Sequence, residues 1–122
     1  MIVLQTTSQS LRATLAAGVS TTPLDLTAVY FDYLPQRTET QQRFASQEEK
    51  VSSATVTTMV AAPAADGIVR NITNVTGYNA DVTSATLTIT KLAGAVSTIQ
   101  VKQILTTGQT VVYEHGTGWQ VL

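Results

Sequence analysis

Apolar and polar residues alternate along most of this chain, with the period of two that is typical of β-strands. The sharpest case is residues 85–91, in which alanine, leucine and isoleucine alternate with three threonines. Residues 10–17 and 24–34 show the same pattern. We expect each of these segments to form a strand that turns one row of side chains toward a core.

Five further segments are typical of strands because they are rich in β-branched residues or alternate in the same way. They are residues 51–60, 68–75, 96–105, 110–114 and 119–122. Within 68–75, strict alternation places Arg70 and Ile72 on one face and Val75 on the other. No amphipathic helix separates the segments, so we predict an all-β fold, an antiparallel β-sandwich or barrel of about six to eight strands.

The chain has 122 residues, close to the usual size of one domain, so a single β domain over residues 1–122 is predicted. Residues 1–9 are expected to be an N-terminal arm. Residues 36–50 interrupt the pattern, since they hold six of the fifteen charged residues of the chain. We expect either a long polar loop or a short helix here. Thr38 with Gln41 resembles a capping box, and Glu39 with Arg43 is a favourable helical pair.

Composition excludes several classes of protein. Charged residues make up only 12% of the chain and the net charge is −1, so we expect no nucleic-acid partner. The chain has no cysteine, which excludes disulfides, thiolate metal sites and a cysteine nucleophile. The 22 threonines supply a neutral polar surface that suits strands.

We expect neither a signal peptide nor a membrane partner. The apolar start, Met1-Ile-Val-Leu4, has no basic region and is followed by polar residues. No window approaches the eighteen apolar residues that a membrane-spanning helix needs. We therefore expect the chain to be made in the cytoplasm and to be soluble.

The sequence indicates no catalytic, metal or cofactor site. His115 is the only histidine, and its neighbour Glu114 would point to the opposite face of a strand. The eight acidic residues are scattered, and no nucleophile motif accompanies them. We predict that the chain is not an enzyme and that it binds no cofactor.

Contacts with other proteins are the alternative. Phe31 and Tyr33 lie on the face of their strand opposite Tyr30, so at least one side of this strand should meet a partner or the polar segment. Phe44 is the only aromatic residue in that segment, and an apolar terminus is normally disordered unless it docks. The candidate interface residues are Ile2, Val3, Leu4, Phe31, Tyr33 and Phe44.

Several motifs of the C-terminal half recur together in one group of proteins. They are Val60-Ala-Ala-Pro-Ala-Ala65, Arg70-x-Ile72, Tyr78-Asn-Ala-Asp81, Ala85-Thr-Leu-Thr-Ile89, Leu105-x-x-Gly108-x-Thr-Val111-x-Tyr113 and Gly116-x-Gly118-Trp119-x-Val121-Leu122. From residue 60 to residue 122 the chain resembles small proteins encoded among the structural genes of tailed bacteriophages. The N-terminal half matches only loosely, and the polar segment 36–50 departs from the family pattern.

The resemblance implies a β-domain of a virion, made in the host cytoplasm. The leading hypothesis is a capsid decoration (cement) protein that binds the major capsid protein on the assembled head, or another virion protein. Self-association, for example as a trimer, is expected. One alternative is a tail, head-tail adaptor or fibre component. Another is a glycan-binding module that stacks a sugar on Tyr33, Tyr78 or Trp119.

Overall fold

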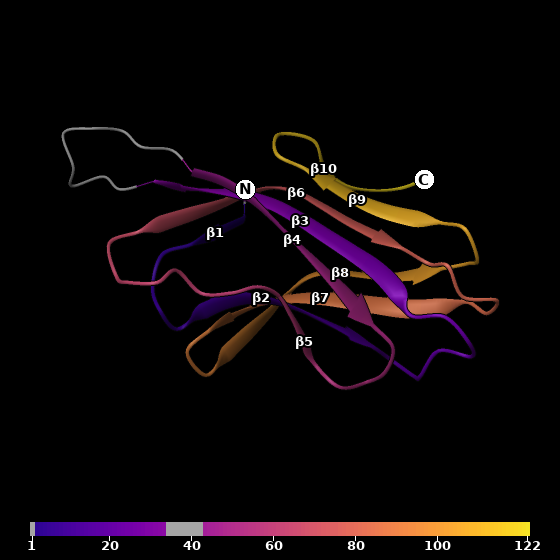
Figure 1. The fold of residues 1–122 in the computed structure, drawn as a ribbon. Coiled ribbons are helices and arrows are strands. Elements are labelled where there is room, and N and C mark those ends of the chain that lie inside the picture. Colours follow the sequence, from indigo (N-terminus) through magenta and orange to yellow (C-terminus); the bar gives the residue numbers. More distant parts are fainter. Residues whose placement is uncertain (1, 34–42) are drawn as a thin grey trace.

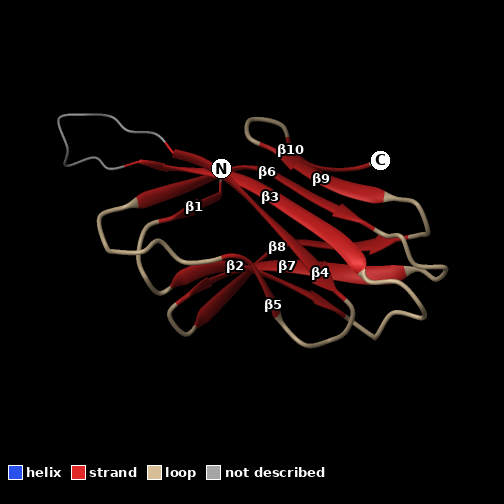
Figure 2. Ribbon diagram, viewed as in Figure 1, coloured by secondary structure: helices blue, strands red, loops and turns tan. Residues whose placement is uncertain are grey.

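Two antiparallel β-sheets pack face to face in the computed structural model, which describes residues 2–33 and 43–122 (Figure 1). The strands are β1 (Ile2–Leu4), β2 (Gln9–Leu15), β3 (Leu24–Tyr33), β4 (Arg43–Val51), β5 (Thr57–Val60), β6 (Val69–Tyr78), β7 (Ala85–Ala93), β8 (Val96–Leu105), β9 (Thr110–Glu114) and β10 (Gly118–Val121). Figure 2 shows strands and loops only, and no helix among the described residues is long and apolar enough to cross a membrane. The predicted all-β antiparallel fold is confirmed. Of the two predicted architectures the structure has the sandwich, since the sheets do not close into a barrel, and its described residues form ten strands in place of about six to eight.

Sheet A has the strand order β10-β9-β6-β3-β4, and the short β1 pairs with β6 beside this path. Sheet B has the order β5-β2-β7-β8. Most connections cross from one sheet to the other, so strands that follow each other in the sequence often lie in opposite layers. This arrangement leaves β4 and β10 at the two sides of sheet A, and β5 and β8 at the two sides of sheet B.

The core lies between the sheets and consists of the inward rows that the alternation predicts. Leu11, Ala13 and Leu15 of β2 and Leu24 and Leu26 of β3 are buried in one cluster between the sheets. Each fully buried leucine or isoleucine stabilises the folded state by about 1.5–3 kcal/mol relative to an exposed one. The other buried apolar residues are Ile2, Leu4, Ala28, Val51, Met59, Val60, Ile72, Val75, Leu87, Ile89, Leu105, Val111 and Tyr113.

Gly77 of β6 faces the core at a point that leaves no room for a side chain. A Cβ atom at this position would lie 2.9 Å from a methyl carbon of Leu87 in sheet B, and 3.2 Å from methyl carbons of Leu26 and Val111. A larger residue would therefore push the sheets apart or force its neighbours out of their rotamers.

A β-bulge at Thr73 corrects one part of the strand pattern. Val29 pairs with Asn74 and the next residue, Tyr30, pairs with Ile72, so Thr73 has no partner on β3. The extra residue reverses the alternation, and Ile72 and Val75 are both buried although strict alternation puts them on opposite faces. The carbonyl of Thr73 accepts a hydrogen bond from the backbone N–H of His115, at 2.9 Å.

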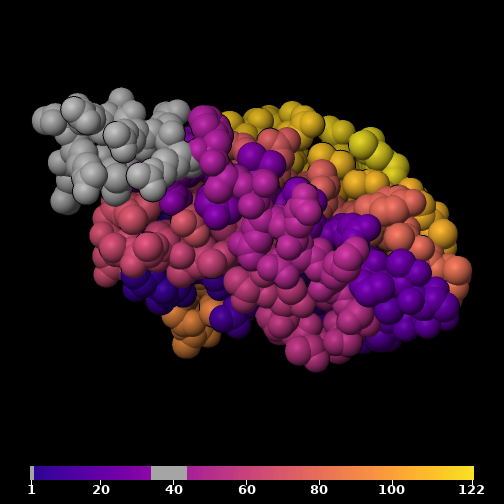
Figure 3. All heavy atoms as spheres, viewed as in Figure 1, coloured from indigo at the N-terminus to yellow at the C-terminus, as the bar shows by residue number. Residues whose placement is uncertain are grey.

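The expectation of a loop or helix over residues 36–50 is wrong for its second half. Residues 43–50 belong to β4, which pairs with β3 along its whole length, and residues 36–42 lie outside the described part of the chain. The prediction of one strand over residues 51–60 is also wrong. Val51 is the last residue of β4, and β5 begins only at Thr57. Figure 3 shows β4 and the chain that leads to β5, in magenta, on the near side of the molecule, where they run from sheet A to sheet B. Gln47 joins the layers there, because its amide donates to the carbonyl of Thr58 and accepts from the N–H of Ala61.

Candidate protein-interaction surface

Three of the predicted interface residues lie in one row on the outer face of sheet A. Val3 pairs with Asn71, Asn71 pairs with Phe31, and Phe31 pairs with Phe44, across β1, β6, β3 and β4 in turn. The rings of Phe31 and Phe44 are 5.5 Å apart between centroids and inclined at 46°. Side chains opposite each other on one face of a sheet are in contact range, so this row forms a continuous strip, which we call the outer row.

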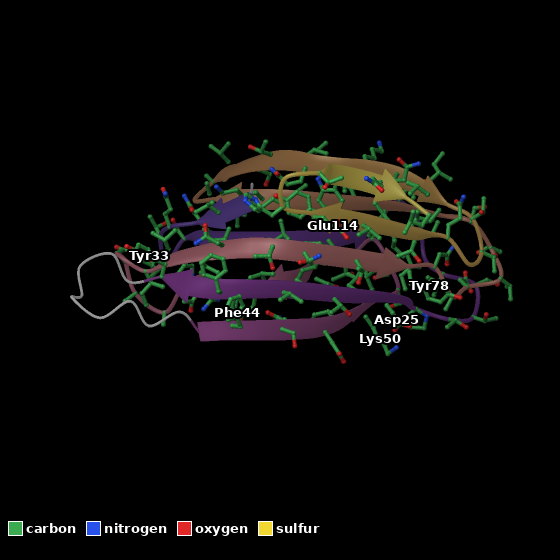
Figure 4. The ribbon with its side chains drawn as sticks, turned by 90° about the horizontal axis from the view of Figure 1, so that it is seen from above. Asp25, Tyr33, Phe44, Lys50, Tyr78 and Glu114 are labelled. Carbon is green, nitrogen blue, oxygen red and sulfur yellow. The ribbon has the colours of Figure 1, made fainter. Side chains whose placement is uncertain are left out.

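Phe44 is the most prominent member of the outer row. Its side chain is 69% exposed, whereas Val3 and Phe31 are half-buried. Tyr33 lies on the same face in the neighbouring row, opposite Val69. Figure 4 shows Tyr33 and Phe44 at one end of sheet A. An exposed aromatic ring on a sheet edge, backed by a second ring, is a common feature of protein contact sites.

The structure corrects the interpretation of the N-terminal arm. Residues 2–4 form β1, which is hydrogen-bonded to β6, and alternation along this strand points Ile2 and Leu4 into the core. Both side chains are buried, so neither is available to a partner in this structure. Only Val3 among the three predicted terminal residues faces outward.

Charged groups occupy the opposite end of the same face. Asp25 and Lys50 are direct register partners on β3 and β4 and form an ion pair. Figure 4 shows them at the end of the sheet far from Tyr33, together with Tyr78. Glu48 of β4 and Glu114 of β9 also face outward, and neither forms an ion pair with a described residue. The outer face of sheet A thus has an aromatic end and, at the opposite end, the Asp25–Lys50 pair, while Glu48 and Glu114 lie in the two rows between them.

Directly inside the aromatic end, Arg70 holds sheet A against the chain that follows β5. Its guanidinium donates to both carboxylate oxygens of Asp32, at 2.7 and 2.9 Å, and to the carbonyl of Ala61 at 2.8 Å. It also lies 4.4 Å from the centroid of the Tyr30 ring. The hydrogen bond to Asp32 raises the pKa of Arg70, while burial acts in the opposite direction. This cluster fixes the strands that display Phe31 and Tyr33.

Asp81 ties two loops together at the other end of the sandwich. Its carboxylate accepts hydrogen bonds from the backbone N–H groups of Ser20, Thr21 and Thr22 at 2.8, 2.9 and 3.0 Å, and from the hydroxyl groups of Thr21 and Thr83. These donors, the N–H of Ser20 foremost, hold the pKa of Asp81 below its ordinary value, although burial opposes them. Successive N–H groups around one carboxylate are an anion-binding arrangement, here used within the chain.

Asn79, two residues earlier, extends this network to a third loop. Its side-chain amide donates to the carbonyls of Thr83 and Leu105, each at 2.9 Å, and its side-chain oxygen accepts from the N–H of Asp81. Its own backbone N–H donates to the carbonyl of Gln109. Asn79 and Asp81 are buried, and they lie at the end of the sandwich at which four connections cross between the sheets. Both residues belong to the motif Tyr78-Asn-Ala-Asp81, but the sequence pattern did not predict this hydrogen-bond network.

The structure does not assemble acids or histidine into a reactive group among the described residues. No cluster of three or more His, Cys, Asp or Glu side chains that could hold a metal ion is found in residues 2–33 and 43–122. His115 is exposed in the turn between β9 and β10. The aromatic residues of the glycan hypothesis are also separated. Tyr33 and Tyr78 lie at opposite ends of sheet A (Figure 4), and Trp119 packs on the core beside Tyr113, with 5.1 Å between ring centroids.

Sequence reasoning also missed the outward apolar residues of β8. Ile99 and Ile104 are 60% and 61% exposed and pair with Thr90 and Thr86 on the outer face of sheet B. A signal was present in the sequence, because Ile104 stands next to Leu105 and one of two adjacent apolar residues in a strand must face outward.

The chain matches no family model, no curated protein and no solved structure in comparisons with known proteins. The resemblance to structural proteins of tailed bacteriophages therefore stays a prediction.

Proposed function

We propose that this chain is a non-enzymatic structural protein of a bacteriophage virion, and that it acts as a decoration or cement protein on the assembled head. The resemblance over residues 60–122 supports the virion as its location. A threonine-rich surface with few charges and a net charge of −1 suits a protein whose contacts are made by sheet faces and edges.

The outer row carries the proposal. Phe44 exposes most of its ring on β4 and contacts Phe31 on β3, and Val3 lies in the same row on β1, beyond Asn71 of β6. Burying an exposed phenylalanine side chain against a partner is favourable by about 1.5–3 kcal/mol. The strip is held by a sheet whose strands are fixed from inside by Arg70 and Asp32, so a partner would meet a surface that needs little ordering.

The partner that fits this strip is a protein surface with an apolar groove or edge, as on a capsomer of the major capsid protein. Because the strip is uncharged, docking through it should depend weakly on salt. A repeated lattice of such sites would bind one copy of the chain at each site and so bridge or brace neighbouring capsomers.

Sedimentation with undecorated heads tests the proposal. Purified chain is mixed with heads that lack it, and the pelleted fraction is measured for the wild type, for Phe44→Ser and for Val82→Ser. Val82 is 67% exposed in the loop between β6 and β7, which makes it a matched control for Phe44 at 69%. We expect the wild type and Val82→Ser to pellet with heads and Phe44→Ser to remain largely in the supernatant. A wild-type chain that never pellets with heads would refute the assignment to the head.

A further inference from the structure

The two sheets carry opposite charge. The strands of sheet B contain three bases and no acid, a formal charge of +3, and the bases are Arg12, Lys91 and Lys102. The strands of sheet A contain five acids and three bases, a formal charge of −2. The net charge of −1 for the whole chain hides this separation. A thin sandwich with one acidic and one basic layer presents complementary faces on opposite sides.

The outward side chains show the same separation. On sheet B, Arg12 and Lys102 face outward, since they pair with Thr90 and Thr88 on the face opposite the buried Ile89. Neither base forms an ion pair with a described residue. On sheet A, Asp25 is neutralised by Lys50, which leaves Glu48 and Glu114 as the outward acids. Each face therefore offers two charges of one sign.

The spacing of these charges is comparable on the two faces. Glu48 and Glu114 are three strands and one row apart, which corresponds to roughly 16 Å from the ordinary dimensions of a sheet. Lys102 and Arg12 are two strands and one row apart, or roughly 12 Å. The long, flexible side chains of the two bases can cover the difference.

Both faces also carry apolar groups beside the charges. The outer face of sheet B has Ile99 and Ile104, which are well exposed, among a field of threonines. The outer face of sheet A has Phe31 and Phe44. Acidic and basic groups set the orientation and aliphatic and aromatic groups supply the burial, as in protein interfaces generally.

We propose that copies of this chain stack on one another, with the outer face of sheet A of one copy against the outer face of sheet B of the next. Contact between two A faces would oppose acids, and contact between two B faces would oppose bases, so charge selects the mixed arrangement. This inference extends the proposed function. It rests on that function only in one assumption, that the chain acts by binding other protein molecules.

The geometry of the stack sets how it grows. The two faces are on opposite sides of the sandwich, so each added copy leaves a free A face and a free B face, and the series stays open. From strand spacing and length, each face covers about 600 Å², or about 1,200 Å² for both partners, the lower end of specific interfaces. We therefore expect weak association that rises steadily with concentration and does not stop at a trimer.

Sedimentation velocity on the purified chain tests the stack without any virion component. The wild type is measured over a concentration series in low salt and in 0.5 M salt, with Glu48→Lys, with Lys102→Glu and with an equal mixture of the two variants. Val82→Glu, a charge change away from both faces, is the control. Circular dichroism of each variant establishes that it is folded.

We expect the average mass of the wild type and of Val82→Glu to rise with concentration in low salt and to fall toward the monomer in high salt. Each face variant alone should need at least roughly tenfold more protein to associate. Their mixture should recover association, because the acidic faces of one variant meet the basic faces of the other. A wild type that stays monomeric in low salt, or association that neither variant weakens, would overturn the stack. Since heads are absent from this experiment, such a failure is distinct from failure to bind heads.

Discussion

Arg70 and Asp32 meet side-on inside the aromatic end of the sandwich, with the Nε and Nη2 donors of the guanidinium on the two oxygens of one carboxylate. They are register partners on β6 and β3, one residue along from the pair of Asn71 and Phe31. The ion pair therefore holds together β6 and β3, the two central strands of the four that form the outer row.

Arg70→Lys should lower the free energy of unfolding by about 1–3 kcal/mol, because lysine cannot make the two-point contact with Asp32 and reach the carbonyl of Ala61 as well. Urea unfolding followed by tryptophan fluorescence measures this. Arg12→Lys, on the outer face of sheet B, serves as the control and should change stability by less than about 0.5 kcal/mol. Equal effects of the two substitutions would contradict a special role for Arg70.

The N-terminal strand offers a direct comparison of neighbouring residues. Leu4→Ala should destabilise the chain by about 2–4 kcal/mol, because Leu4 is fully buried. Val3→Ala removes an outward side chain and should cost less than about 1 kcal/mol. Thermal unfolding of both variants distinguishes a core strand from a free arm. If Leu4→Ala were as stable as Val3→Ala, residues 2–4 would not be part of the core.

Gly77→Ala should destabilise the chain by about 1–3 kcal/mol, since the added methyl group would lie 2.9 Å from Leu87. Gly18→Ala is the matched control, because a Cβ atom there has only an ordinary contact, 3.7 Å from the carbonyl oxygen of Ser52. Chemical unfolding of the two variants gives the comparison. A neutral Gly77→Ala would mean that the sheets do not approach closely at this point.

Acid should destabilise the chain through Asp81. The pKa of Asp81 is lower in the folded chain than its ordinary value of 3.8, so the unfolded chain binds the proton more readily. The contribution of Asp81 to stability is therefore complete above about pH 5 and is lost as the pH falls below about 4. Urea midpoints between pH 2 and 7 measure this. Asp81→Asn should be less stable at neutral pH and should show a shallower loss in acid, and an unchanged acid profile would contradict the assignment.

Periodicity predicts a strand where the inward positions are apolar. Residues 85–91 are the clear case, and the placement of Phe31 opposite to Tyr30 followed from the same rule. The strand β4 was not recognised because its inward positions, Ala45, Gln47 and Glu49, lie at the edge of the sheet and are largely polar. The alternation of apolar and polar residues does not predict such a strand. The strand forms because its backbone pairs with that of β3.

Other features depend on contacts between distant parts of the chain. A three-residue strand such as β1 is too short to show a period, and its place is set by pairing with β6, almost seventy residues later. The bulge at Thr73 exists only relative to β3, so alternation within β6 could not reveal it. The outer row is of the same kind, because Val3, Phe31 and Phe44 become neighbours only through the register of four strands.

The most direct test of the central claim, that the chain is a structural component of a virion head, is its copy number in purified phage particles. The proposal implies that a phage encodes the chain, and quantitative mass spectrometry of purified particles of that phage would give the ratio of this chain to the major capsid protein. A decoration protein on a symmetric lattice should be present in hundreds of copies, a large fraction of the capsid protein. Six or twelve copies would move the chain to a tail or portal ring, and absence from the particles would contradict the virion role altogether.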